Sequence, residues 1–246
     1  MRGVRDPVMI RNSEVELKRG VQRNGENFSS QVLVYDKGLE PYPVTYQHQL
    51  DLVRAKKHRV LTDDILILVE HPDVYTYGRK SRGVSGVAGF PSFAIERGGD
   101  VTYHNPGQIV GYPILSLNPE ERDLHRHLRR LEDWLIETLG HFGVLAERRE
   151  GATGVWVSGK QKKIASIGVA VSSWVTYHGF ALNVSNELQG FSRIHPCGFP
   201  AEVMTSLNCE LGQKSPSLAE VKKALIRGFP KHFHRQIVLP DPLQVI

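Results

Sequence analysis

Cys197 is the residue of this sequence best suited to act as a nucleophile, because it lies between Pro196 and Gly198. Proline restricts the chain that enters the turn, and glycine leaves space beside the sulfur. A nucleophilic thiol must be a thiolate, and the ordinary cysteine pKa of roughly 8.5 is lowered by a nearby cation. A free cysteine is otherwise most often a small buried apolar residue, which is our interpretation of Cys209.

Three lysines are candidates for that cation, because they lie just before or at the start of the apolar segment 163–171: Lys160, Lys162 and Lys163. Lysines clustered at a turn are most simply a solvated tip, and we expect only one of them to point inward. Strand alternation cannot decide which, since the strand that follows can be buried on both faces. The pattern therefore leaves the cation unassigned.

A second candidate site is the stretch 97–113, which reads R-G-G-D-V-T-Y-H-N-P-G-Q-I-V-G-Y-P. Its four glycines allow backbone to approach a ligand closely. Arg97 supplies a planar, permanently charged donor group, and His104 titrates near neutrality. An elaborate turn between two strands would have a similar composition, so both interpretations stay open on composition alone.

Three groups of segments together resemble the signature of the lipoyl(octanoyl) transferases. They are the stretch 97–113, K-I-A-S-I-G-V at 163–169 with T-Y-H-G-F-A-L-N-V at 176–184, and H-P-C-G-F at 195–199. They occur in the family's order, and the resemblance covers roughly residues 31–212. Asn105 departs from the pattern, which usually has glycine there. Because asparagine tolerates left-handed backbone, we expect the turn to survive, while close packing at that point is in question.

The resemblance implies a catalytic dyad in which Cys197 carries the acyl thioester and Lys163 lowers its pKa or acts as general base. It also implies that three segments contact the substrate, with His71, Arg79 and His178 as possible further site residues. His71 is otherwise a satisfied turn residue, and Arg79 begins a Gly- and Ser-rich loop, 79–90, that is either a mobile surface loop or a lid. The implied substrate-binding residues are Arg97, Gly98, Gly99, Asp100, Val101, Thr102, Tyr103, His104, Ser166, Ile167, Gly168, Gly179, Phe180 and Ala181.

The reaction implied by the resemblance is transfer of an octanoyl group from octanoyl-acyl carrier protein to a lysine of a lipoyl domain. The acceptors would be lipoyl domains of 2-oxoacid dehydrogenases and the glycine cleavage H protein. A thioester on the enzyme would be the intermediate, and no ATP, cofactor or metal is expected. Burying about six methylenes in an apolar tunnel is worth ~5 kcal/mol, enough to select chain length.

Other functions fit the residues less well. An ATP-dependent lipoate or biotin ligase of the same fold would not need Cys197 and would carry an adenylate-binding loop of the G-R-G-R-x-G type, which is missing. A Cys-dependent amidotransferase of the same superfamily should match R-G-G-D-V-T-Y-H poorly. A catalytically dead carrier-protein binder should lack the cysteine or the lysine. The sequence has no complete zinc pattern, and no G-x-G-x-x-G opens a helix.

Composition bounds the partners and the compartment. The 246 residues carry a net charge of +5, which favours acidic partners. Lysine and arginine are dispersed and form no nucleic-acid motif, so no nucleic acid partner is expected. Two cysteines fit a reducing compartment, and neither a secretory signal nor an apolar run of membrane-spanning length is present. We therefore expect a cytoplasmic protein that does not bind membranes.

The elements that must position these residues are an α/β (α+β) arrangement with a mixed or antiparallel sheet and helices on one side. The resemblance implies the biotin/lipoyl protein ligase-like fold. We expect a loosely packed extension at 1–30 and one catalytic domain at 31–246. The periodicity predicts strands at 31–36, 65–70 and 114–117, and a meander of three strands over 154–184. It predicts helices at 43–58, from 118 to about 142, with His125 and His127 on a solvated basic face, and after a capping box at Ser217.

Overall fold

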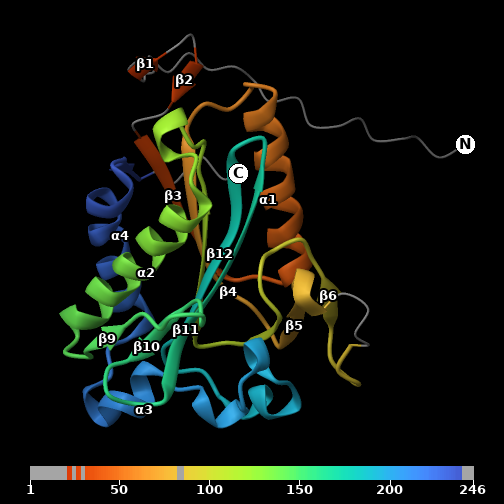
Figure 1. Ribbon diagram of the computed structural model, residues 1–246, viewed down its shortest axis with the longest axis vertical. Helices are drawn as coiled ribbons and strands as arrows, with labels where there is room; N and C mark the ends of the chain where they lie inside the picture. Colours follow the sequence, from red (N-terminus) through yellow and green to blue (C-terminus); the bar gives the residue numbers. More distant parts are fainter. Residues whose placement is uncertain (1–20, 24–25, 29–30, 82–85, 240–246) are drawn as a thin grey trace, which may run out of the picture.

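A mixed sheet of eight strands forms the centre of the protein, as a computed structural model shows for residues 21–23, 26–28, 31–81 and 86–239 (Figure 1). The two strand pairs at one edge that involve β3 are parallel, and the remaining pairs are antiparallel. The predicted mixed sheet is therefore confirmed. In spatial order the strands are β13 (Gln236–Val238), β3 (Gln31–Leu39), β4 (Asp64–Glu70), β8 (Gln108–Ile114), β12 (Val175–Asn183), β11 (Lys162–Ser172), β10 (Val155–Val157) and β9 (Ala146–Glu147).

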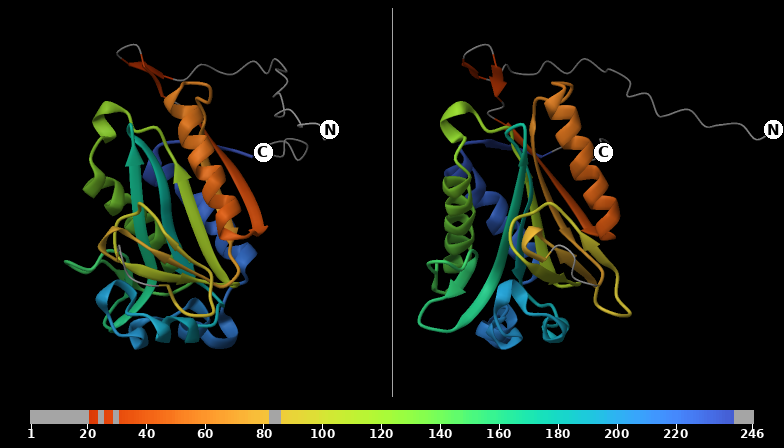
Figure 2. Two further views of the ribbon diagram at one scale, coloured as in Figure 1. Left: turned by 90° about the vertical axis from the view of Figure 1, so that its right-hand side faces the viewer. Right: turned by 45° about the vertical axis from the view of Figure 1, so that its right-hand side comes forward.

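Helices cover both faces of this sheet, so the expectation of helices on one side was wrong (Figure 2). Helix α1 (Tyr42–Lys57) packs on one face, and α2 (Leu124–His141) and α4 (Leu218–Phe233) pack together on the other. The reason lies in the continuous apolar run of β4. Leu66 and Leu68 join the core under α2 and α4, while their neighbours Ile65 and Ile67 join the core under α1.

A smaller three-stranded sheet lies beside the start of α1. It has the order β6 (Ser92–Ala94), β5 (Val74–Tyr77) and β7 (Val101–His104), and a 3₁₀ turn, η1 (Arg79–Ser81), follows β5. Tyr42 of α1 packs against Val74 and Ile95. The predicted loop 79–90 contains this turn and, at residues 82–85, lies outside the described residues.

The helix-start signals were read correctly, although α2 begins later than predicted. Asn118 forms a capping box with Glu121, but around a 3₁₀ turn, η2 (Pro119–Glu121); α2 begins at Leu124 with Asp123 as its cap. The Ser217 capping box opens α4 as predicted.

The placement of His127 on a solvated face was wrong: it is buried against Phe233, and burial lowers its pKa to about 4.

Short helices and turns connect β12 to α4 at the lower end of the sheet in Figure 1. Cys209, in the short helix α3 (Leu207–Leu211), is exposed, so its interpretation as a buried apolar residue was wrong. The Cys197 side chain lies outside the described part of the structure. The elements are η3 (Gln189–Arg193), η4 (Pro196–Gly198), η5 (Ala201–Val203), α3 (Leu207–Leu211) and η6 (Gly212–Lys214).

Of the predicted N-terminal extension, 1–30, the structure describes only a two-stranded ribbon, β1 (Val21–Arg23) with β2 (Glu26–Phe28). The rest of that extension and residues 240–246 lie outside the described residues. No helix in the described ranges has the length and apolarity needed to cross a membrane.

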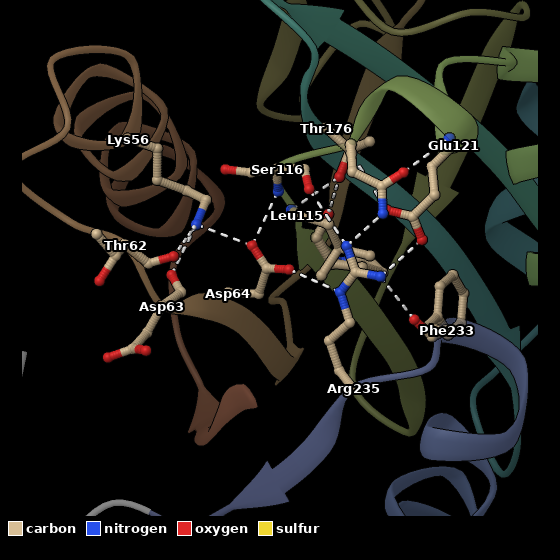
Figure 3. A network of polar contacts seen from close by, with 12 residues as sticks. Lys56, Thr62, Asp63, Asp64, Leu115, Ser116, Glu121, Thr176, Phe233 and Arg235 are labelled. Atoms are coloured by element: carbon tan, nitrogen blue, oxygen red, sulfur yellow. Dashed lines mark hydrogen bonds and ion pairs between the residues drawn. The ribbon is translucent and has the colours of Figure 1, made fainter. Parts of the chain in front are cut away.

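A buried ion-pair network joins α1, β4, the η2 turn and the chain after α4 (Figure 3). Asp64 has no exposed side-chain area, and its carboxylate pairs with Lys56 at 2.9 Å and with Arg235 at 3.0 Å. The Arg235 guanidinium also donates to both carboxylate oxygens of Glu121, at 2.6 and 2.8 Å. Burial alone would raise the pKa of Glu121, but the Arg235 pairing holds it below its ordinary value. Pairing with the two carboxylates also raises the pKa of Arg235, so Arg235 and Glu121 stay charged at neutral pH.

Replacing Arg235 by methionine is expected to destabilise the protein by about 3–5 kcal/mol, because two buried carboxylates lose their shared cation. Denaturant unfolding measures this difference. Arg54→Met is the matched control, because it breaks an exposed ion pair. The Arg54 side chain is 64% exposed and that of its partner Asp51 is 52% exposed, so the substitution should cost under about 1 kcal/mol. Equal effects of the two substitutions would contradict the structural role of the network.

Candidate functional site

Lys163, near the start of β11, is buried, with a relative exposure of 1%. Among the residues whose side chains are described, none hydrogen-bonds to its Nζ. The ammonium lies 5.7 Å from the ring centroid of Trp156, close enough for a cation–π attraction. The two other candidate lysines point outward: Lys160 donates to Glu210 and Lys162 donates to the Glu202 carbonyl. Lys163 is thus the one lysine of the three that points inward.

The glycine at position 154 makes room for this lysine. A Cβ at Gly154 would lie 2.7 Å from Lys163 Cε and 2.5 Å from the Ala165 carbonyl oxygen. Its φ of +124° also lies in the region that residues with a Cβ rarely adopt. The absence of a side chain at position 154 therefore leaves the space that the end of the Lys163 side chain occupies.

The turn η4, which contains Cys197, lies near Lys163. Its next residue, Phe199, packs edge-on against Trp156 with ring centroids 5.1 Å apart. Trp156 therefore contacts both Lys163 Nζ and the residue that directly follows the η4 turn. Further on, the Thr205 amide donates to the Lys163 carbonyl at 3.0 Å. Gly198 has a φ of +78°, a left-handed conformation that glycine adopts without strain.

The segment Arg97–Asp100 runs along the edge of β11 beyond the end of β10. The Gly98 amide donates to the Val169 carbonyl at 2.9 Å, so this segment continues the hydrogen bonding of the sheet. Arg97 Nη2 donates to the Thr76 carbonyl at 2.6 Å and to its hydroxyl at 3.1 Å, which braces the segment from β5. A Cβ at Gly168 would lie 2.8 Å from the Gly98 carbonyl oxygen. The glycines predicted from the motif therefore let these two backbones meet.

A cavity of about 340 Å³, the outer cavity, opens beside Lys163 on the α2 face of the sheet. Its volume falls in the range of small-molecule sites. The walls come from the Arg97–Asp100 segment, the first two turns of α2, the loop before β10 and the middle of β11. The lining residues are Lys80, Gly98, Gly99, Asp100, Leu124, Leu128, Gly151, Ala152, Thr153, Lys163, Ile167, Gly168, Val169 and Phe199.

A second cavity of about 30 Å³, the inner cavity, shares Ile167 and Gly168 with the outer one. It has room for about two water molecules. In this conformation it is too small for an eight-carbon chain. Its lining residues are Tyr42, Thr76, Ile95, Arg97, Thr102, His104, Val110, Tyr112, Ser166, Ile167, Gly168, His178, Gly179, Phe180 and Ala181.

Three buried histidines lie in and behind the inner cavity. His71 is hydrogen-bonded to the Glu40 carbonyl at 2.7 Å and to the Tyr112 hydroxyl at 2.9 Å, and its ring packs 5.9 Å from that of His104. Burial lowers the pKa of His71 to about 4 and that of His104 to about 3, and it also lowers the pKa of His178. All three are therefore neutral at pH 7.

Glu96 is the anion nearest to His178, at 3.7 Å between Oε2 and Nε2, which is longer than a hydrogen bond. The nearby His178 ring lowers the pKa of Glu96, and burial opposes this effect. Together with the hydrogen bond from the Tyr46 hydroxyl, the ring brings the pKa of Glu96 to about 2. His178 has a φ of +57° in the middle of β12, and the side chain of Gln49 accepts its backbone N–H at 2.8 Å. Helix α1 thus holds this irregular strand position.

The histidines predict a loss of stability in mild acid. The unfolded chain has histidines with ordinary pKa values near 6.5 and therefore binds more protons than the folded protein below that pH. The stabilisation is complete above about pH 6.5 and is lost as pH falls toward 4. Between pH 7 and 5, His71 alone should cost on the order of 2 kcal/mol, measured by urea unfolding. His71→Gln should flatten this dependence, whereas replacing the exposed His58 by glutamine should leave it unchanged.

The predicted substrate residues divide between the two cavities with two exceptions. Val101 and Tyr103 of β7 face the other way, into a separate apolar cluster with Phe191, because side chains alternate along a strand. Of the three possible site residues, His178 lines the inner cavity, His71 lies behind it, and Arg79 is exposed. Asn105 is buried; it donates to the Glu187 carbonyl, and Gly107 takes the left-handed conformation in that turn.

Several lining residues were missed from the sequence. Tyr42 of α1 and Leu124 and Leu128 of α2 lie far from the motifs in the chain and read as ordinary core positions. Lys80 lines the outer cavity, although the prediction chose its neighbour Arg79. Within the described part of the chain, no group of three or more His, Cys, Asp or Glu is arranged to hold a metal ion.

Comparisons with known proteins agree on one family. The family described as lipoyl protein ligase A/B catalytic domain matches residues 43–230. An octanoyltransferase from a Nostoc species is 42% identical over 213 residues, covering 84% of this chain and 94% of the relative. One from Geobacter sulfurreducens is 51% identical over 170 residues, covering 68% and 70%.

Two solved structures share the fold. Lipoate-protein ligase A bound with ATP superposes with a TM-score of 0.67 at 17% identity, covering 87% of this chain and 89% of that one. A putative lipoate protein ligase from T. acidophilum with bound lipoic acid gives a TM-score of 0.62 at 17% identity, with the same coverage. The lipoyl protein ligase-like fold predicted from the sequence is confirmed.

Proposed function

Because the chain belongs to the family of lipoyl protein ligase A/B catalytic domains, we propose that it is an octanoyltransferase. It takes an octanoyl group from octanoyl-acyl carrier protein and transfers it to the ε-amine of a lysine on a lipoyl domain. The similarity to relatives named octanoyltransferases supports this activity. The acceptors are the lipoyl domains of 2-oxoacid dehydrogenases and the glycine cleavage H protein, and the reaction takes place in the cytoplasm. Residues 31–246 act as one catalytic domain.

The observation that carries the mechanism is the buried Nζ of Lys163, which has no hydrogen-bond partner among the described side chains and lies on a 340 Å³ cavity. A buried ammonium is costly unless an anion or a bound group compensates it. The thiolate of Cys197, on the adjoining turn, would be such an anion. Pairing would stabilise the thiolate and lower its pKa, which is the requirement for a nucleophile at neutral pH.

The reaction then proceeds in two displacements on one carbon. The Cys197 thiolate attacks the carbonyl of the carrier thioester, and the pantetheine thiol leaves with a proton from Lys163. The acceptor ε-amine then attacks the enzyme thioester, Lys163 takes the proton that the amine loses, and the Cys197 thiolate is released. A thioester is converted into an amide, so no ATP is needed. The thioester and its arm fit the outer cavity, and the chain end reaches the inner cavity after the aromatic side chains there move apart.

A transfer assay with two substrate sets tests this function. The protein is mixed with a lipoyl domain and either octanoyl-acyl carrier protein without ATP, or octanoate with ATP. We expect a mass gain of one octanoyl group on the lipoyl domain in the first mixture alone. Amide formation only in the second mixture would contradict the proposal and identify an ATP-dependent ligase.

A further inference from the structure

Glu132, in the middle of α2, is a buried carboxylate outside the motifs, with a side-chain exposure of 2%. A buried charge is retained in a fold when its partners compensate it. Glu132 has three: the Gly154 amide at 3.2 Å, Arg129 at 2.8 Å and Arg148 Nε at 3.3 Å. Two of these three partners belong to one loop.

That loop runs from Arg148 to Gly154, and Glu132 binds both of its ends. One carboxylate oxygen, Oε2, pairs with the Arg148 side chain at the beginning of the loop. The other, Oε1, accepts the amide of Gly154 at its end. Residues with a Cβ rarely adopt the Gly154 φ of +124°, so the loop closes through a glycine whose amide the carboxylate holds.

The same loop forms a wall of the outer cavity. Gly151, Ala152 and Thr153 line it, and Gly154 lies directly against the end of the Lys163 side chain. A shift of the loop by even a fraction of an ångström would therefore change both the cavity wall and the space available to Lys163 Nζ. The carboxylate lies behind this wall and is not among the cavity-lining residues.

We propose that Glu132 is a positioning residue for acyl transfer, which sets the Arg148–Gly154 loop as a wall of the cavity and thereby fixes the Lys163 ammonium. The proposal rests on the proposed function, since the rate that it governs is that of octanoyl uptake. Glu132 acts through the Gly154 amide and does not touch the substrate. Its effect should appear in the rate of the chemical step rather than in folding alone.

The experiment compares three variants of the full chain in single-turnover uptake of octanoyl from octanoyl-acyl carrier protein. Glu132→Leu removes the acceptor, and we expect about a 100-fold slower uptake at saturating carrier, since a misplacement near 1 Å can cost that much. Glu132→Gln keeps an oxygen for the Gly154 amide but loses the ion pair with Arg148, so it should recover only part of the rate and stay about tenfold slower than the native protein. Asp133→Asn is the matched control, because Asp133 also pairs with Arg148 but is 46% exposed; it should stay within about twofold of the native protein.

Hydrogen exchange of the peptide spanning residues 149–156 gives a readout that needs no activity. Glu132→Leu should speed exchange of the Gly154 amide, and Asp133→Asn should not. Folded Glu132→Leu with native uptake and native exchange would overturn the proposal. If that variant does not fold, Glu132→Gln must still be slower than Asp133→Asn, and equal rates would overturn it. Failure of the native protein to take up octanoyl would instead contradict the proposed function, leaving the exchange result to decide the role of Glu132.

Discussion

Replacing Lys163 by methionine should lower the rate of octanoyl transfer by about 10²–10⁴-fold, the usual contribution of a positioned acid–base group. The methionine side chain fills nearly the same space without a charge. Because it removes a buried ammonium that has no hydrogen-bond partner among the described side chains, we expect the melting temperature to stay unchanged or to rise. Activity and stability would thus change in opposite directions, as expected for a group kept for chemistry.

The control for this substitution is Lys162→Met, one residue earlier on the same strand. Lys162 is only partly buried and donates to the Glu202 carbonyl, so its loss should change the rate by less than about threefold. Steady-state transfer and thermal unfolding of the two variants are measured together. A Lys163→Met protein that keeps most of its transfer rate would remove Lys163 from the mechanism.

Gly154→Ala should lower the transfer rate by about 100-fold, although it adds a single methyl group. That methyl would lie 2.5 Å from the Ala165 carbonyl oxygen and 2.7 Å from Lys163 Cε. The carbonyl belongs to a sheet strand and cannot move far, so the lysine side chain or the loop must move. The strained φ adds a stability cost of about 1–3 kcal/mol. Single-turnover uptake and denaturant unfolding separate the two effects.

Gly159→Ala separates backbone strain from displacement of the lysine. Gly159 lies in the turn of the same hairpin with a φ of +70°, but a Cβ there meets nothing within 4 Å. It should lose stability to a similar degree while keeping near-native activity. Equal losses of activity in both alanine variants would show that strain alone is responsible.

The motifs, whose glycines and charged residues carry a local signal, predicted many of the residues that line the two cavities. It could not select Lys163 by alternation, and the structure gives the reason. Trp156 pairs with Lys163 and Val155 with Ala165, so the register skips Ile164 at a bulge. A bulge interrupts the two-residue period on which such a prediction depends. Only the resemblance singled out Lys163, the lysine of the three that the structure buries.

The parts of the site that the sequence did not predict come from tertiary packing. Leu124, Leu128 and Tyr42 follow ordinary helical patterns, and their place on a cavity depends on which sheet face each helix covers. The arrangement of helices on both faces was nevertheless signalled by the uninterrupted apolar run of β4. Two of the three partners of Glu132, Arg148 and Gly154, lie 16 and 22 residues further along the chain, and no local pattern links them to it.

The most direct test of the mechanism is the intact mass of the protein after mixing with octanoyl-acyl carrier protein alone. We predict a gain of one octanoyl group that hydroxylamine removes, that is absent in Cys197→Ala, and that forms far more slowly in Lys163→Met. An octanoyl group that survives hydroxylamine, or that still forms in Cys197→Ala, would contradict a thioester on Cys197.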